Sequence, residues 1–157
     1  MERSILINSH NSWSQLEEAW LGDVYPSSWY DHLTPAVRDV FQQLTEITKQ
    51  DLAVIQNKLE SFGITVRRPE YNSIDDFVDS KGALVKPEIC PRDSFVTVGN
   101  MLFTPLDIPP AWQSIVQHYL NSNQTTKFCE YHHAFNGANV VRVGKDIIID
   151  TDIYDAA

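Results

Sequence analysis

Residues 129–133 read Cys-Glu-Tyr-His-His and include the side-chain types that bind zinc. Thiolates and imidazoles are ordinary zinc ligands, but structural sites space them as close pairs such as Cys-x-x-Cys. No such spacing occurs here, and adjacent His132 and His133 on a strand would point to opposite faces. We therefore expect no metal ion and no other cofactor, with a metal site at Cys129 as the weaker alternative.

Two other side chains have the chemistry of a nucleophile or a base. Cys90 directly precedes Pro91, and His10 lies in the polar stretch 8–12. A half-buried thiol is the more ordinary role for such a cysteine, and a hydrogen-bonded surface histidine is the more ordinary role for His10. Two cysteines in 157 residues do not make a disulfide scaffold. They fit a reducing interior, so we expect a cytoplasmic protein.

Asp93 is the carboxylate that stands out, because it ends the run Cys-Pro-Arg-Asp just before an apolar segment. Its ordinary structural role would be an ion pair with Arg92 or Arg68. Asn139 stands at the same point before a second, similar segment, where it can simply begin a strand. A function for Asp93 or Asn139 therefore depends on where the surrounding helices and strands place these side chains.

The clearest predicted element is a helix that begins at Thr34 and Pro35 and extends to about Phe62. Threonine is a favoured N-cap and proline is favoured in the first turn. Gly63 stands where a left-handed C-terminal cap is expected, and residues 64–66 predict a strand after it. Steps of three and four residues predict one apolar stripe along this helix, made of Val37, Phe41, Leu44, Thr48, Leu52, Ile55, Leu59 and Phe62.

Two segments predict β-hairpins, one over residues 95–103 turning at Gly99 and one over 140–149 turning at Gly144. The turns lie 45 residues apart, and a second helix over 111–121 lies between them. A repeat of this period is typical of modular folds such as propellers. We therefore expect a single α/β domain over residues 1–157.

The remaining expectations concern the start of the chain and the large aromatic residues. Residues 5–7 and 16–21 predict short strands around a polar loop, and residues 25–33 are expected to be irregular. The four tryptophans are expected in the core or in contacts between modules; they are Trp13, Trp20, Trp29 and Trp112.

Composition excludes several classes of protein. Hydrophobic residues make up 43% of the chain and charged residues 21%, which are ordinary values for a globular domain. The formal charge of -9 repels phosphate backbones, so we expect no nucleic-acid partner. No apolar run approaches the ~18–20 residues of a membrane span, so we expect no membrane association either.

Three segments, taken in order, carry a recognisable pattern. The first is Asn-Ser-His-Asn-Ser-Trp at 8–13, the second is Cys-Pro-Arg-Asp at 90–93 followed by Phe-Val-Thr-Val-Gly-Asn at 95–100, and the third is Phe-Asn-Gly-Ala-Asn-Val-Val-Arg-Val-Gly-Lys-Asp at 135–146. Together they resemble the amidinotransferases of the glycine amidinotransferase type. The resemblance implies the N-terminal part of a pentein, an α/β-propeller of ββαβ modules. This chain would hold two to three of them, roughly 1–68, 69–125 and an incomplete 126–157.

The resemblance also implies a chemistry, the transfer of an amidino group from arginine to an amine. In that family a cysteine thiolate attacks the guanidinium carbon, a histidine acts as acid and base, and carboxylates grip the guanidinium. Asp93 matches a substrate-binding aspartate, with Arg92 beside it in the same motif. Asn139 falls where the family generally has a second aspartate. The family's histidine and cysteine lie downstream, so we expect no catalytic residue here.

The resemblance leaves three functions open. The chain can be the N-terminal part of an amidinotransferase that is inactive alone, with arginine or another guanidino compound as its ligand. It can be a non-catalytic module that binds guanidino compounds or another protein. It can also be a structural remnant whose hairpin edges pair with a second copy. Because an incomplete propeller exposes apolar surface and strand edges, we expect self-association or a complementing half.

Overall fold

The computed structural model describes residues 7, 9–11, 13–71, 73–78, 82, 89–105, 108, 110–122, 127–131, 137–143 and 146–149. The chain divides into two compact units. The first, which we call the helix unit, comprises Leu16–Cys90 with Pro109–Trp112. The second, which we call the hairpin unit, comprises Met1–Gln15, Pro91–Ile108 and Gln113–Ala157.

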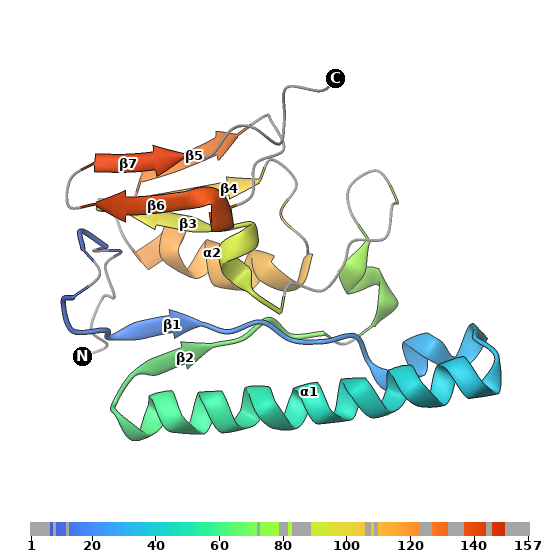
Figure 1. The fold of residues 1–157 in the computed structure, drawn as a ribbon. Helices are drawn as coiled ribbons and strands as arrows, with labels where there is room; N and C mark the ends of the chain where they lie inside the picture. The colour runs from blue at the N-terminus through green and yellow to red at the C-terminus, as the bar shows by residue number, and fades with distance from the viewer. Residues whose placement is uncertain are drawn as a thin grey trace. The chain divides into compact units, whose positions relative to one another are not determined.

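The helix unit is built on a βαβ arrangement. Strand β1 (Glu18–Trp20) and strand β2 (Thr65–Arg67) pair in parallel, with Ala19 opposite Val66. The long helix α1 (Pro35–Ser61) connects them and packs on β2 (Figure 1). Parallel strands need such a crossover connection, and a helix is the usual one. The predicted helix and the strand after it are therefore confirmed.

The ends of α1 follow from its sequence. Thr34 is extended and Pro35 occupies the first turn, where its missing N–H removes no helical hydrogen bond. At the other end Gly63 has a φ of 77°, and its N–H donates to the Glu60 carbonyl at 2.9 Å. The N–H of Ile64 donates to the Leu59 carbonyl at 3.2 Å. This is the glycine cap that the sequence predicts.

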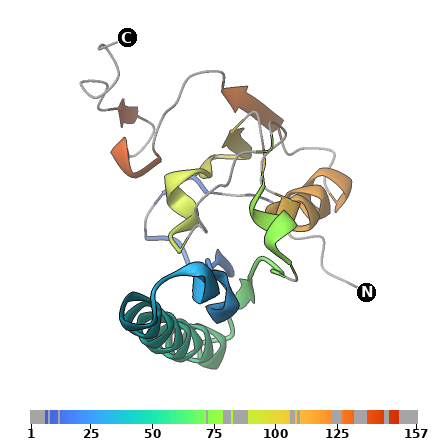
Figure 2. The same cartoon turned by 90° about the vertical axis from the view of Figure 1, so that its right-hand side faces the viewer.

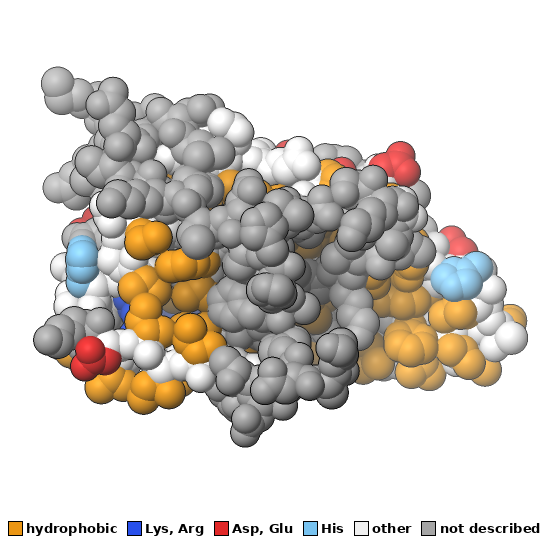
Figure 3. All heavy atoms as spheres, turned by 90° about the horizontal axis from the view of Figure 1, so that it is seen from above, with side chains coloured by type: hydrophobic (Ala, Val, Ile, Leu, Met, Phe, Trp, Pro, Cys, Tyr) orange, Lys and Arg blue, Asp and Glu red, His pale blue; other side chains and the backbone are white. Residues whose placement is uncertain are grey.

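The apolar stripe of α1 does not face a core. Only Thr45 and Leu52 of this helix are buried. The helix turns a more polar side toward its neighbours, so most of its large apolar residues stay accessible. We call these residues, with Phe62 just after the helix, the exposed apolar face of α1; they are Val37, Val40, Phe41, Leu44, Ile47, Val54, Ile55 and Phe62. The face of the molecule drawn in Figure 3 also carries hydrophobic side chains at its surface.

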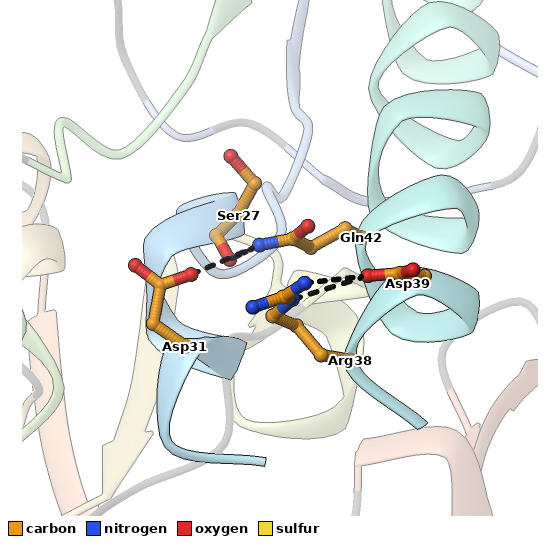
Figure 4. A network of polar contacts seen from close by, with 5 residues as sticks. All are labelled: Ser27, Asp31, Arg38, Asp39 and Gln42. Carbon is orange, nitrogen blue, oxygen red and sulfur yellow. Dashed lines mark hydrogen bonds and ion pairs between the residues drawn. The ribbon is translucent and has the colours of Figure 1, made fainter. Parts of the chain in front are cut away.

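A short 3-10 helix, η1 (Ser27–His32), packs beside the first half of α1 (Figure 2). The contact is partly polar, because the side-chain amide of Gln42 donates to the Ser27 carbonyl at 3.2 Å and to Asp31 Oδ1 at 3.1 Å (Figure 4). This segment was expected to be irregular. It forms a helical turn because the Trp29 N–H donates back to the Pro26 carbonyl at 2.9 Å.

Aromatic rings, some buried and some half-buried, stack on one another in the helix unit. Trp112, 1% exposed, stacks on Trp20 with ring centroids 5.8 Å apart. Tyr25 stacks on Trp29 at 4.9 Å and meets the buried ring of Phe77 edge-on at 4.7 Å. The expected core position is thus confirmed for Trp112, whereas Trp20 and Trp29 are half-buried and stack on neighbouring rings.

Trp13 is different, and its expected burial is wrong. The residue belongs to the hairpin unit and is 77% exposed. It lies in a tight local turn, in which Asn11 Oδ1 accepts the N–H groups of Trp13 at 3.0 Å and Ser14 at 2.6 Å. This side-chain acceptor closes the turn through the backbone, so the turn does not depend on burial of the indole ring.

The hairpin unit contains most of a ββαβ module. Strand β3 (Val96–Val98) pairs antiparallel with β4 (Met101–Pro105) around Gly99, whose φ is 60°. Helix α2 (Pro110–Ser122) then crosses to β5 (Lys127–Tyr131), which pairs in parallel with β4. The division between the two units falls within α2. The predicted hairpin and second helix are confirmed, whereas β5 was not expected.

A second hairpin completes the described part of this unit. Strand β6 (Val140–Val143) pairs antiparallel with β7 (Asp146–Ile149), as the sequence predicts. Buried residues of the unit that the structure describes include Ile7, Pro91, Phe95, Leu102, Thr104, Ile115, Val116, Tyr119, Gly137 and Val140. The predicted strand at residues 5–7 is wrong at Ile7, which is in no strand; the other two residues lie outside the described ones.

The architecture is therefore mixed α/β with small sheets of two, three and two strands. None of these sheets closes on itself within the residues described. In that same part of the chain, neither α1 nor α2 combines the length and apolar character that crossing a bilayer requires.

Candidate functional site

Two short turns of the hairpin unit carry the residues singled out by the sequence. Turn η3 (Pro91–Asp93) comes shortly before β3, and turn η4 (Gly137–Asn139) comes directly before β6. In η3 the buried ring of Pro91 fixes the backbone, and its carbonyl accepts the N–H groups of Ser94 at 3.1 Å and Phe95 at 2.8 Å. Asp93 therefore lies at the end of a well-anchored turn.

The structure brings η3 and η4 into contact. Gly137 is buried so closely against η3 that an added Cβ would collide with the carbonyl oxygen of Arg92 and with Cγ2 of Val96. From the other side, Nη2 of Arg92 donates to the Val140 carbonyl at 2.6 Å. The three predicted site residues, two on η3 and one on η4, thus belong to neighbouring turns.

Asp93 is exposed and makes no ion pair among the described residues. Its expected structural partners are engaged elsewhere. Arg68 pairs with Asp23 Oδ2 at 3.0 Å inside the helix unit, and Arg92 bonds to the Val140 carbonyl. The expected ion pair of Asp93 with Arg92 or Arg68 is therefore wrong, and the side chain of Asp93 is exposed.

Asn139 is partly buried, and its amide nitrogen Nδ2 is shielded from solvent. This nitrogen has no hydrogen-bond partner in the part of the chain that the structure describes. A buried donor without an acceptor costs about 1–3 kcal/mol, so such groups are uncommon in folded proteins. Asn139 stands directly before strand β6, as the structural alternative of a strand-entry residue expects, but among the described residues its side-chain nitrogen has no acceptor.

The far ends of both hairpins are held by residues 9–11, which we call the strap. Ser9 pairs with Gly99 through two backbone hydrogen bonds, of 2.7 and 2.9 Å. Arg142 of β6 donates to the Ser9 carbonyl, to Ser9 Oγ at 2.8 Å and to the Asn11 carbonyl at 3.3 Å. The exposed His10 ring lies over Gly99. Strand β3 and strand β6 are thus each fixed both at a site turn and near the strap.

Sequence reasoning missed Gly137 and Arg142. A signal existed for the first, because a glycine two residues before Asn139 marks a close backbone approach. For Arg142 the signal was weak, since an arginine within a strand usually faces solvent. Its three acceptors lie more than 130 residues away in the chain, where no local pattern predicts them.

The remaining candidates from the sequence are Cys90, Cys129, His132 and His133. Cys90 is exposed, so its expected half-burial is wrong; only the proline that follows it is enclosed. Cys129 lies in β5 with its backbone opposite Phe103, while His132 and His133 lie outside the described residues. Within the described residues, no three His, Cys, Asp or Glu side chains gather where they could hold a metal ion.

Comparison with known protein families gives no match, and no curated protein matches either. Solved structures do match. The inosamine-phosphate amidinotransferase StrB1 from Streptomyces griseus has a TM-score of 0.63 at 18% sequence identity, over 90% of this chain and 54% of that protein. SxtG, an amidinotransferase of the saxitoxin biosynthetic pathway from Microseira wollei, has a TM-score of 0.60 at 20% identity, over 90% of this chain and 56% of that protein.

These identities are too low to carry residue roles across, but the agreement of backbones over nine-tenths of the chain is extensive. The chain spans about half the length of the structures that it matches. These matches lead to one conclusion. The chain has the fold of an amidinotransferase over most of its length.

Proposed function

We propose that this chain forms part of an amidinotransferase-type protein and that η3 and η4 hold a guanidino group, such as that of arginine. The observation that carries the proposal is that the exposed carboxylate of Asp93 and the partly buried amide of Asn139 lie on two turns in contact. The shared fold supports it, because both matched structures are amidinotransferases.

The chemistry of the two side chains fits a flat cation. A guanidinium has only hydrogen-bond donors, so it would use both oxygens of Asp93 and the amide oxygen of Asn139. Asn139 accepts fewer bonds than a carboxylate and supplies no charge. We therefore expect weaker binding than a site with two carboxylates would give, by up to a few kcal/mol.

The proposal also includes the predicted module boundaries, the propeller fold and the location of the protein. The modules, with the boundaries predicted above, would be parts of a pentein propeller, and the protein would be cytoplasmic. Amidino transfer needs a nucleophilic cysteine and an acid–base histidine, and no residue of this chain matches them in the resemblance. The chain alone would thus bind the guanidino compound without transferring its amidino group.

Calorimetric titration with arginine tests this function. We expect heat of binding at millimolar arginine, and a loss of at least tenfold in affinity in Asp93→Asn, which keeps the shape but removes the charge. Asp146→Asn is the matched control, because it removes the same charge from an exposed position in β7. No heat at millimolar arginine, or equal weakening by both substitutions, would rule out the site.

A second candidate function is association through a second copy of the chain, favoured by the exposed apolar face of α1. The helix carries three basic and four acidic residues and is nearly neutral, on a chain of charge -9. Two such helices packed antiparallel could place Val37 opposite Phe62 and Leu44 opposite Ile55. Apolar side chains would then meet along the whole contact, as an isologous interface requires.

A further inference from the structure

The guanidinium of Arg92 forms a hydrogen bond with the backbone of β6. Its Nη2 donates to the Val140 carbonyl at 2.6 Å, across 48 residues of sequence. Val140 directly follows Asn139, and Arg92 directly precedes Asp93. One hydrogen bond thus links the residues next to the two proposed ligands of the guanidino group.

The backbone of Arg92 makes a second link at the same place. Its carbonyl oxygen lies where a Cβ of residue 137 would be, so the absence of a side chain at Gly137 lets the two turns meet. Side chain and main chain of Arg92 therefore both contact the segment 137–140. The hydrogen bond to the Val140 carbonyl needs a long side chain that ends in an N–H donor, as arginine has.

Direct contact between Arg92 and a bound guanidinium is unfavourable, because both groups carry a positive charge. Arg92 could instead bind the carboxylate of arginine, but the hydrogen bond to Val140 already occupies one of its two terminal nitrogens. Arg92 is therefore unsuited to bind the guanidinium directly, whereas Asp93 and Asn139 each have an oxygen that can accept a hydrogen bond from it.

We propose that Arg92 is a positioning residue, which sets the separation and orientation of Asp93 and Asn139 by tying η3 to β6. This inference rests on the proposed function for its effect on binding. The claim that Arg92 controls the placement of Asn139 does not depend on any ligand. Positioning of this kind matters because a guanidinium-binding pair must be held close to its productive geometry before the ligand arrives.

The chain offers a matched control in Arg142. This arginine also donates to backbone carbonyls of a distant segment, but at the strap and not at η3 and η4. Replacing either arginine by methionine removes one charge and keeps much of the side-chain volume. We expect Arg92→Met and Arg142→Met to lower the melting temperature by similar amounts, while only the first changes the site.

The binding test uses two probes, arginine and agmatine, which has the same guanidinium but no carboxylate. In Arg92→Met we expect both to bind about tenfold more weakly, and in Arg142→Met we expect both to bind within about twofold of wild type. Arg92→Lys should recover part of the loss, since an ammonium can still donate to one carbonyl. A tenfold change corresponds to about 1.4 kcal/mol.

The sign of the effect is itself informative. Removing a positive charge near the site should strengthen the binding of a cation if electrostatics alone acted. Unchanged or tighter binding in Arg92→Met would therefore overturn the proposal. Weaker binding of arginine with unchanged agmatine would also overturn it, because Arg92 would then contact the substrate carboxylate directly.

A measurement without ligand separates this inference from the proposed function. The side-chain amide of Asn139 can be followed by nuclear magnetic resonance, and we expect its protons to exchange at least tenfold faster in Arg92→Met but not in Arg142→Met. If this holds while wild type binds no arginine, the proposed function fails and the positioning role remains. Equal behaviour of the two variants would remove the positioning role whatever the ligand does.

Discussion

Gly137 is the residue on which the contact between η3 and η4 depends most directly. A methyl group there would collide with the Arg92 carbonyl oxygen, which is backbone and cannot rotate away. We expect Gly137→Ala to lower the free energy of unfolding by about 1–3 kcal/mol, as overpacking of a close contact does. Chemical denaturation followed by circular dichroism measures this change.

Gly82 supplies the comparison for that substitution. It has a φ of 77°, but among the described residues none beyond its chain neighbours lies within 4 Å of where its Cβ would be. Gly82→Ala should therefore cost only the backbone strain of a left-handed residue, about 1–2 kcal/mol, with no effect on arginine binding. If Gly137→Ala bound arginine as well as Gly82→Ala does, the contact between the turns would not matter for the site.

Tyr25 gives the helix unit a dependence on alkaline pH. Burial raises the pKa of its hydroxyl above the ordinary value of 10.0, and the neighbouring Tyr30 raises that pKa further. Above pH 10 the unfolded chain loses this proton before the folded chain does, so the free energy of unfolding falls as pH rises. Below pH 10 both states keep the proton and the effect is absent.

We expect Tyr25→Phe to make the free energy of unfolding fall less steeply above pH 10 than it does in wild type. Denaturation curves at several alkaline pH values measure the slope, and tyrosinate absorbance of the two proteins locates the titration of Tyr25 itself. Identical slopes would show that Tyr25 titrates alike in the folded and the unfolded chain.

At the scale of elements, Leu52 is the apolar residue that holds α1 to its unit. It is 5% exposed, whereas Val54 on the same helix is 67% exposed. Leu52→Ala should lower the free energy of unfolding by about 2–5 kcal/mol, because it removes buried contacts and leaves a cavity. Val54→Ala should change it by no more than about 0.5 kcal/mol. Thermal and urea denaturation of the two variants test the contrast.

The elements that sequence could predict are those whose ends are marked locally. Pro35 and Gly63 mark the limits of α1, and Gly99 marks the turn of the first hairpin. Whether an element is buried depends on its neighbours in space. The stripe on α1 was correctly predicted as apolar, yet Phe41 and Leu44 are exposed because the helix meets η1 and β2 with another side.

In the candidate site, too, local sequence predicts the elements but not the contacts between them. The similar sequences after Asp93 and Asn139 predict that the two residues occupy like places, and the structure shows their turns in contact. The hydrogen bond from Arg92 to Val140 and the strap bonds of Arg142 join segments far apart in the chain. Such contacts follow from tertiary packing, and the spacing of residues within one segment does not predict them.

At the scale of the whole molecule, the exposed apolar face of α1 predicts self-association, since a stripe of large apolar residues in water favours a partner. Sedimentation velocity at increasing concentration should show dimers, and Phe41→Glu with Leu44→Glu should shift the protein to monomers. Gln50→Glu with Asn57→Asp adds the same charge at exposed positions outside this face and should leave the dimer intact. A compact monomer at all concentrations would contradict the prediction.

The strap has a consequence for the order of events during synthesis. Ser9 bonds to Arg142 across 133 residues, whereas most of the helix unit is the continuous segment Leu16–Cys90. At a typical rate of about 5–20 residues per second, Ser9 is made at least several seconds before its arginine partner. The helix unit can thus assemble most of its structure while the growing chain still lacks the residues that finish the hairpin unit.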